Sequence, residues 1–308
     1  MKYLSSLQIA ATAALLALAS ACTSVTFKQQ DLAFDFDAKT DSLTMELEYL
    51  DVGPVEHTGM GFFSSSTDNS ARFTKAHEFV SRVAKGDPIF IAFMPYSDWD
   101  LEELGWDSTV DEDLRRYLRQ IFVVEARASL GANDHLNLYQ KIHFPNLSRG
   151  LELVNGEIRK QALATVPRDR TNSTPMRNLE ARNEEIFLAD AKAGKDWVVW
   201  TEAGLEVSLP FCSQYTLELM RELLIESNEA TGEELKDGVV FLRQAFAAAK
   251  DFRIEADHVV LVFGDENGDL NFSFKDGFLE TLPDYRDGFV KHLKDEGMTF
   301  PTIYSKGE

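Results

Sequence analysis

The segment LAFDFDAKTDSLTMELEY, residues 32–49, determines the fold class of this chain. Apolar and polar side chains alternate in two runs within it, and the polar residues 38–42 separate the two runs. Alternation with a period of two places the apolar side chains on one face of a strand and the polar side chains on the other. Two such strands joined by a short polar turn predict an antiparallel hairpin with one face toward solvent.

Further pairs of strand-like segments occur along the chain, with segments of helical periodicity between them. Paired strands are predicted at 121–129 with 136–144, 197–201 with 205–211, and 259–263 with 270–274. Helices are predicted at 71–85, 113–120, 147–163, 175–193, 215–225, 233–250 and 283–296. A continuous apolar run at 88–94 predicts a central buried strand. Because hairpins and helices alternate without a regular βαβ order, we predict an α+β fold with mainly antiparallel sheets.

The composition is that of a packed globular protein. The chain has 308 residues, of which 44% are hydrophobic and 22 are phenylalanine, so it can bury a sizeable core. This length accommodates one large domain or two ordinary ones. The polar break at 166–174 is the best candidate for a hinge or a domain boundary.

The charge balance excludes one class of partner. A formal net charge of −20 argues against nucleic acid, because phosphate binding requires clustered lysine and arginine. The loop at 53–70 contains the glycine-rich segment 59–64, but it has neither a third glycine nor a basic residue. We therefore predict no nucleotide site in this loop.

Residues 1–22 have the order of an export signal. Lys2 gives a positive start, residues 4–18 form an uncharged and mostly apolar run, and the small residues 19–21 precede Cys22. The run is too short and wrongly flanked to span a membrane. This ending resembles the lipobox of bacterial lipoproteins, in which cleavage occurs before a cysteine that then carries the lipid.

The lipobox resemblance implies where the mature protein begins and where it is located. Residues 1–21 are then a lipoprotein signal peptide, and residues 22–308 form a mature extracytoplasmic region with acyl chains such as palmitate on Cys22. Thr23 follows the cysteine, and in bacteria with two membranes, lipoproteins without aspartate at that place tend to be sorted to the outer membrane or the cell surface. The alternative is an ordinary secretory signal cut at the same bond, which would leave Cys22 free to pair with Cys212.

Acidic residues are concentrated between positions 97 and 113. They are Asp98, Asp100, Glu102, Glu103, Asp107, Asp111, Glu112 and Asp113. One interpretation is a cation site or an acidic docking face, and a hydrolase using two of these carboxylates is a related alternative. The other interpretation is a solvated loop followed by a helix start, where acidic residues favour the helix dipole. We favour the second, because no metal-ligand spacing stands out.

A second acidic segment, 265–276, has the spacing of a calcium loop. Its candidate ligands are Asp265, Asn267, Asp269, Asn271 and Asp276. The segment resembles the calcium loops of dockerin modules, but Leu270 replaces the glycine that the turn requires. Its flanks alternate as strands around Asn267-Gly268, so we predict a hairpin rather than a calcium site. Calcium-dependent binding or adhesion stays an alternative, and no other cofactor is predicted.

The remaining reactive residues do not form a known signature. The histidines are at 57, 77, 135, 143, 258 and 292, without a metal-binding or catalytic spacing. Cys212 and Ser64–Ser66 have no identifiable catalytic partner in the sequence, so the role of Cys212 is left open. We therefore expect a lipid-anchored envelope protein with a non-catalytic binding or structural role. Its expected partners are the membrane and an envelope protein or a small ligand.

Overall fold

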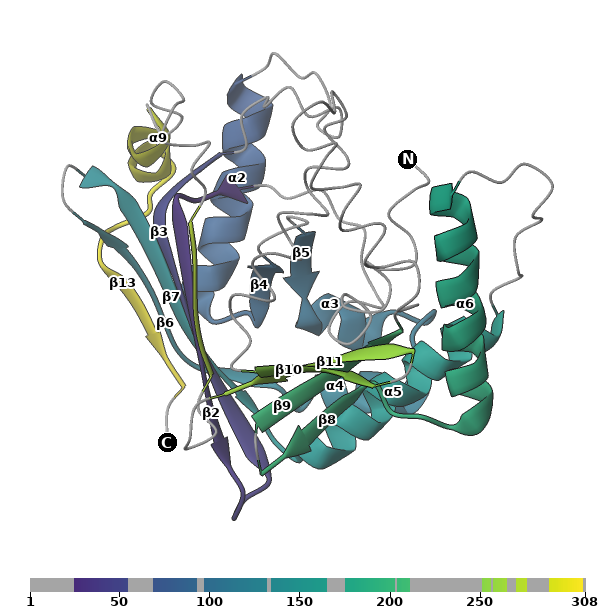
Figure 1. Ribbon diagram of the computed structural model, residues 1–308. Helices are drawn as coiled ribbons and strands as arrows, with labels where there is room; N and C mark the ends of the chain where they lie inside the picture. The colour runs from purple at the N-terminus through teal and green to yellow at the C-terminus, as the bar shows by residue number, and fades with distance from the viewer. Residues whose placement is uncertain are drawn as a thin grey trace. The chain divides into compact units, whose positions relative to one another are not determined.

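The computed structural model describes most of the chain from Val25 to Lys306 (Figure 1). Described are residues 25–54, 69–92, 97–131, 134–164, 175–202, 204–210, 251–255, 257–264, 270–275 and 288–306. The chain divides into two compact units. The split unit comprises the described residues up to Leu147 and those from Leu270 onward, and the middle unit comprises those from Ser148 to Gly264. Both units combine helices with antiparallel sheets, which confirms the predicted α+β class.

The split unit is built on an antiparallel sheet with the strand order β12-β2-β3-β7-β6-β13, and β1 also pairs with β3. The strands are β1 (Val25–Thr26), β2 (Gln29–Asp37), β3 (Ser42–Pro54), β6 (Phe122–Leu130), β7 (Leu136–Phe144), β12 (Leu270–Lys275) and β13 (Thr302–Ser305). The predicted hairpin at 32–49 is confirmed as β2 and β3, with Leu32 opposite Leu47 in the register. The pairing of β6 with β7 is confirmed as well.

Two of the described helices of the split unit, α2 and α9, pack against each other. Helix α2 (Asn69–Lys85) lies along one face of the sheet, where its side chains Ala76, Val80 and Val83 are completely buried. Helix α9 (Phe289–Asp295) packs against α2 and buries Phe289 and Leu293 completely. Each of these large apolar side chains contributes about 1.5–3 kcal/mol through burial. Helix α9 begins at Phe289 and not near Pro283, since Gly288 is its N-cap.

The acidic segment of the split unit is more ordered than predicted. Strands β4 (Ile89–Ala92) and β5 (Ser97–Asp100) form a two-stranded antiparallel sheet, followed by α3 (Leu101–Trp106) and α4 (Glu112–Leu118). Residues 89–92 of the apolar run at 88–94 therefore form a strand, but the prediction of a central strand was wrong. Among the described residues, β4 pairs only with β5. The continuous apolar sequence of β4 therefore does not indicate a central position, because β4 belongs to a sheet of only two described strands.

The middle unit has a four-stranded antiparallel sheet with the strand order β10-β11-β9-β8. Its elements are α5 (Leu147–Ala164, beginning at the unit boundary), α6 (Pro175–Ala193), β8 (Val198–Thr201), β9 (Gly204–Pro210), β10 (Asp251–Glu255) and β11 (His258–Phe263). The core contains Ile158 and Ala162 of α5, Ala191 of α6, and Trp197 directly before β8. The predicted hairpin at 197–211 is confirmed as β8 and β9.

A buried asparagine joins α5 to the start of β8. Asn155 is 2% exposed, and its Oδ1 accepts hydrogen bonds from the backbone N–H groups of Trp197 (2.9 Å) and Val198 (3.1 Å). Its Nδ2 donates to the carbonyl oxygen of Val198 at 2.7 Å. The side chain thus satisfies backbone groups that would otherwise be buried without partners.

The predicted hairpin between 259–263 and 270–274 was wrong. Strand β11 pairs with β9 and β10 in the middle unit, and β12 pairs with β2 in the split unit. Both segments are strands, but each has its partner elsewhere in the chain. The predicted hinge at 166–174 and the predicted helices at 215–225 and 233–250 lie outside the described residues.

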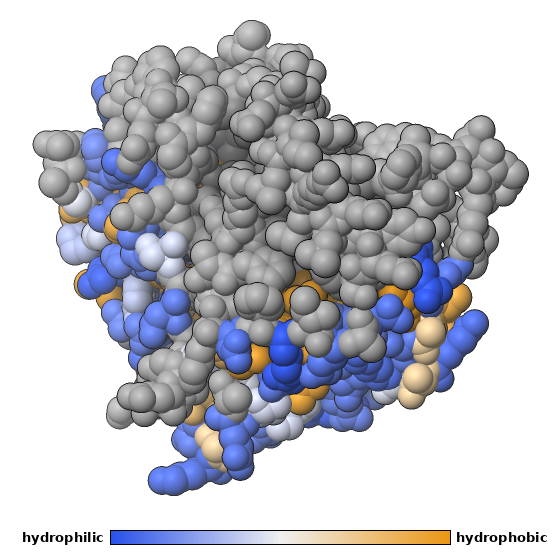
Figure 2. All heavy atoms as spheres, viewed as in Figure 1, coloured by the Kyte–Doolittle hydropathy of each residue, from blue (hydrophilic) through white to orange (hydrophobic). Residues whose placement is uncertain are grey.

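None of the described helices combines the length and apolar character needed to cross a bilayer. Figure 2 shows that the described residues on the visible face are mostly hydrophilic.

Candidate functional site

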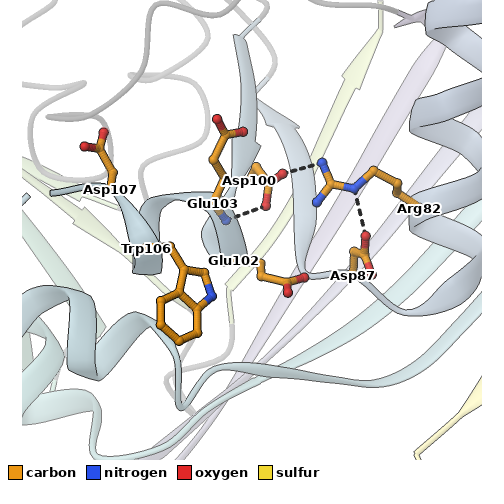
Figure 3. A pocket seen from close by; sticks show the side chains of 7 residues that line it. All are labelled: Arg82, Asp87, Asp100, Glu102, Glu103, Trp106 and Asp107. Carbon is orange, nitrogen blue, oxygen red and sulfur yellow. Dashed lines mark hydrogen bonds and ion pairs between the residues drawn. The ribbon is translucent and has the colours of Figure 1, made fainter.

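A pocket of about 750 Å³ opens beside the two-stranded sheet of the split unit (Figure 3). Its lining consists of Arg82, Asp87, Asp100, Glu102, Glu103, Trp106 and Asp107. These residues come from the last turn of α2, the turn that follows it, the end of β5, and α3 with its C-cap. Among the described residues, five carboxylates therefore share the lining with one guanidinium group and one indole ring.

The turn after α2 is fixed from several sides. The N–H of Gly86 donates to the carbonyl of Val83 (3.1 Å) and the N–H of Asp87 to that of Arg82 (3.1 Å), the pattern of a Schellman cap. Gly86 has φ +90°, and a Cβ there would overlap the ring of Tyr304. The buried side chain of Gln140 donates from Nε2 to the carbonyl of Asp87 at 2.6 Å. These contacts hold the inner wall of the pocket in one position.

Arg82 bridges two carboxylates at this inner wall. Its Nε lies 2.8 Å from Asp87 Oδ2, and its Nη1 contacts Asp100 Oδ2. The side chain of Asp100 is only 11% exposed. Burial opposes the charge of Arg82, but hydrogen bonds to Asp100 and Asp87 outweigh burial and raise the pKa of the guanidinium. Figure 3 shows Arg82 reaching between these two carboxylates.

Helix α3 supplies the outer carboxylates. Asp100 is its N-cap, and Asp100 Oδ1 accepts a hydrogen bond from the N–H of Glu103 at 2.9 Å. Glu102 and Glu103 occupy the first turn, where a negative charge is favourable near the helix N-terminus. Their side chains are exposed, and neither forms an ion pair with another described residue. The carboxylate of Asp107 accepts hydrogen bonds from the N–H and the hydroxyl of Thr109, which lower its pKa.

An exposed tryptophan lies at the far end of the pocket from Arg82 (Figure 3). Trp106 is 67% exposed, which is unusual for the largest apolar side chain. The guanidinium carbon of Arg119 lies 4.7 Å from the centre of the Trp106 ring, within the range of a cation–π contact. Arg119 also donates from Nη1 to the carbonyl oxygen of Gly105 at 2.5 Å. The indole therefore already stacks with a guanidinium group, and much of its surface is still accessible.

The structure brings together only part of the predicted acidic cluster. Asp100, Glu102, Glu103 and Asp107 line the pocket. Asp111 is the N-cap of α4, while Glu112 and Asp113 pair with Arg116 on that helix, so these three do not line it. The side chain of Asp98 lies outside the described residues.

Sequence reasoning missed Arg82, Asp87 and the helix α3. Asp100 followed by Glu103 at the third helical position is a cap signal, and it could have located α3. No local pattern indicated that Arg82 would meet Asp100, because the pairing depends on how β5 lies against the end of α2.

The other predicted site residues are less informative. Asn271 is an exposed residue of β12, whereas Asp265, Asn267, Asp269 and Asp276 lie outside the described residues. Cys22, Cys212, His57 and Ser64–Ser66 also lie outside them. Among the described residues, no group of three or more His, Cys, Asp or Glu side chains is arranged to hold a metal ion.

Two described histidines pair with a carboxylate. His258 Nε2 lies 2.6 Å from Asp190 Oδ2, which also accepts a hydrogen bond from the indole N–H of Trp197 at 3.3 Å. His135 Nδ1 lies 2.8 Å from Asp51 Oδ1. Each pair links residues far apart in the sequence, so both serve to connect elements within one unit.

Comparison with protein-family models, with curated protein sequences and with solved structures gave no match to this chain.

Proposed function

We propose that this chain is a lipid-anchored envelope protein that binds a cationic partner through the pocket beside α3 and does not act as an enzyme. The observation that carries the proposal is that one pocket is lined by the exposed indole of Trp106 and by the carboxylates of Glu102 and Glu103, which lack a described ion-pair partner. A formal net charge of −20 attracts cations to the molecule as a whole. The pocket adds a place where a cation contacts both carboxylate and ring.

The chemistry of the pocket favours a guanidinium or ammonium group carried on a chain. Arg82 already contacts two carboxylates of the pocket, those of Asp87 and Asp100, and Arg119 stacks on the Trp106 ring, so this lining accommodates guanidinium groups in the protein itself. An exposed cation–π contact contributes about 0.5–1 kcal/mol, and each exposed ion pair about 0.2–1 kcal/mol. Together these contacts give a dissociation constant in the millimolar range or weaker for one side chain. A partner with several cations would bind more tightly through multivalency.

Two carboxylates of the pocket, those of Asp100 and Asp107, are poorly suited to the hydrolase alternative. A glycosidase-like or related mechanism needs one carboxyl group with a raised pKa to act as an acid. Asp107 has a lowered pKa, and Asp100 is engaged by both Arg82 and the N–H of Glu103. We therefore prefer binding over hydrolysis for this site.

The pocket can be tested by NMR titration of the mature protein with an oligo-arginine peptide. We expect the indole N–H signal of Trp106 to shift, and the shift to weaken at high salt because exposed charge pairs are screened. An equally long peptide with citrulline in place of arginine should cause little change. Absence of a Trp106 shift with the arginine peptide would contradict the proposal.

Variants distinguish peptide binding in the pocket from a general attraction of the peptide to the net charge of the protein. The double substitution Glu102→Gln with Glu103→Gln should weaken peptide binding at least fivefold. The control is Asp35→Asn with Glu296→Gln, which removes two exposed acidic charges outside the pocket. Equal weakening by both double variants would mean that the peptide responds only to net charge.

The anchoring part of the proposal concerns Cys22. The apolar run at 4–18 and the small residues at 19–21 support cleavage before Cys22, with acyl chains holding the mature protein to a membrane. Expression in a bacterial host should place the wild type in the detergent phase and Cys22→Ser in the aqueous phase. An unmodified cysteine at the mature N-terminus, found by mass spectrometry, would contradict acylation.

A further inference from the structure

Two of the five pocket carboxylates already hold a cation that belongs to the chain. Arg82 contacts Asp87 through Nε and Asp100 through Nη1, and in each case the oxygen is Oδ2. The remaining oxygen of Asp100, Oδ1, accepts the helix-capping hydrogen bond from Glu103. Both oxygens of Asp100 are therefore engaged.

A divalent metal ion would need these oxygens. Calcium takes six to eight oxygen ligands at about 2.3–2.6 Å, several of them from carboxylates. A metal ion close to Asp87 and Asp100 would also meet the positive charge of Arg82, and this repulsion is twice as large for a divalent ion as for a monovalent one. Among the described residues, five carboxylates line the pocket, and no group of three or more His, Cys, Asp or Glu side chains is arranged to hold a metal ion.

We propose that Arg82 is the specificity-determining residue of the pocket, because it acts as a fixed counter-ion that keeps divalent metal ions out. The inner carboxylates are neutralised, and Glu102, Glu103 and Asp107 are left for an organic cation that also contacts Trp106. The identity of that organic ligand rests on the proposed function. The exclusion of metal does not depend on it and can be measured separately.

The test is a terbium titration of the mature protein, with Trp106 as the luminescence sensitiser and calcium as the competitor. Arg82→Met removes the counter-ion without adding a ligand, and it should lower the half-saturating terbium concentration at least tenfold. The control is Arg116→Met, because Arg116 also pairs with two carboxylates, Glu112 and Asp113, but is 61% exposed on α4. This control should bind terbium as the wild type does.

A second variant covers the case in which Arg82→Met does not fold, as judged by circular dichroism. Arg82→Lys keeps the charge but cannot bridge both carboxylates as the planar guanidinium does, so it should gain at least threefold in terbium affinity. The proposal is overturned if the folded Arg82 variants bind terbium no better than Arg116→Met, or if the wild type already binds as tightly as they do. If the terbium titrations give the expected result but the wild type does not bind the oligo-arginine peptide, only the proposed function is contradicted.

Discussion

Replacing Asn155 by leucine provides a direct test of how the middle unit is held together. The substitution keeps the branching of the side chain at Cγ and removes both of its polar atoms. Three backbone groups then lose their partners, namely the N–H of Trp197, the N–H of Val198 and the carbonyl of Val198. Because Asn155 is 2% exposed, water cannot replace the lost hydrogen bonds without local opening.

The expected loss of stability follows from these three groups. Each buried polar group left without a partner costs about 1–3 kcal/mol. The leucine side chain regains part of this through apolar burial, about 1.5–3 kcal/mol for a full side chain. We therefore expect the free energy of unfolding of the middle unit to fall by about 2–5 kcal/mol.

Hydrogen exchange followed by NMR measures the effect at the site itself. The amide of Val198 should be protected in the wild type and should exchange at least tenfold faster in Asn155→Leu. Urea denaturation of the same variant gives the change in the free energy of unfolding. A Val198 amide that stays protected, together with a loss below about 1 kcal/mol, would refute the role assigned to this side chain.

Two further predictions concern the split unit. Burial and the positive charge of Lys306 lower the pKa of His143 below its usual value near 6.5, so stability should be full above pH 6.5 and should decrease as the pH falls from there toward the lowered pKa. NMR titration should show a higher pKa for His143 in Lys306→Gln, and an unchanged pKa would contradict this. Gly86→Ala should cost about 2–4 kcal/mol in urea denaturation, because φ is +90° and a Cβ would overlap Tyr304. Gly297→Ala, at φ +92° but with nothing within 4 Å, should cost only about 1–2 kcal/mol, and equal losses would rule out the Tyr304 contact.

The elements of this fold could be predicted wherever a local pattern determines them. Alternation over 32–49 predicted β2 and β3 and their pairing, because the turn between them is short and polar. The same alternation identified β11 and β12 as strands, but it could not identify their partners. An Asn-Gly dipeptide favours a tight turn, whereas the observed pairing depends on segments more than two hundred residues away in the case of β12 and β2. Pairing with distant strands outweighed the local preference.

The candidate site could be predicted only in part for a similar reason. The acidic residues of α3 were identified, since their charge is visible in the composition of the segment. Their arrangement around a pocket was not predicted, because the pocket depends on Arg82 in the last turn of α2 and on the exposed position of Trp106. The contact between Arg82 and Asp100 is set by tertiary packing, which has no periodicity in the sequence.

The order of the two units along the chain has a consequence for biosynthesis. The strands that complete the main sheet at its two sides, β12 on β2 and β13 on β6, follow the whole middle unit in the sequence. A nascent chain that has not yet reached residue 270 therefore presents the open sides of β2 and β6 together, and open strand edges recruit other chains. At about 5–20 residues per second, this exposure lasts for several seconds or more. Export in an unfolded state, followed by folding of the complete chain, would avoid that interval entirely.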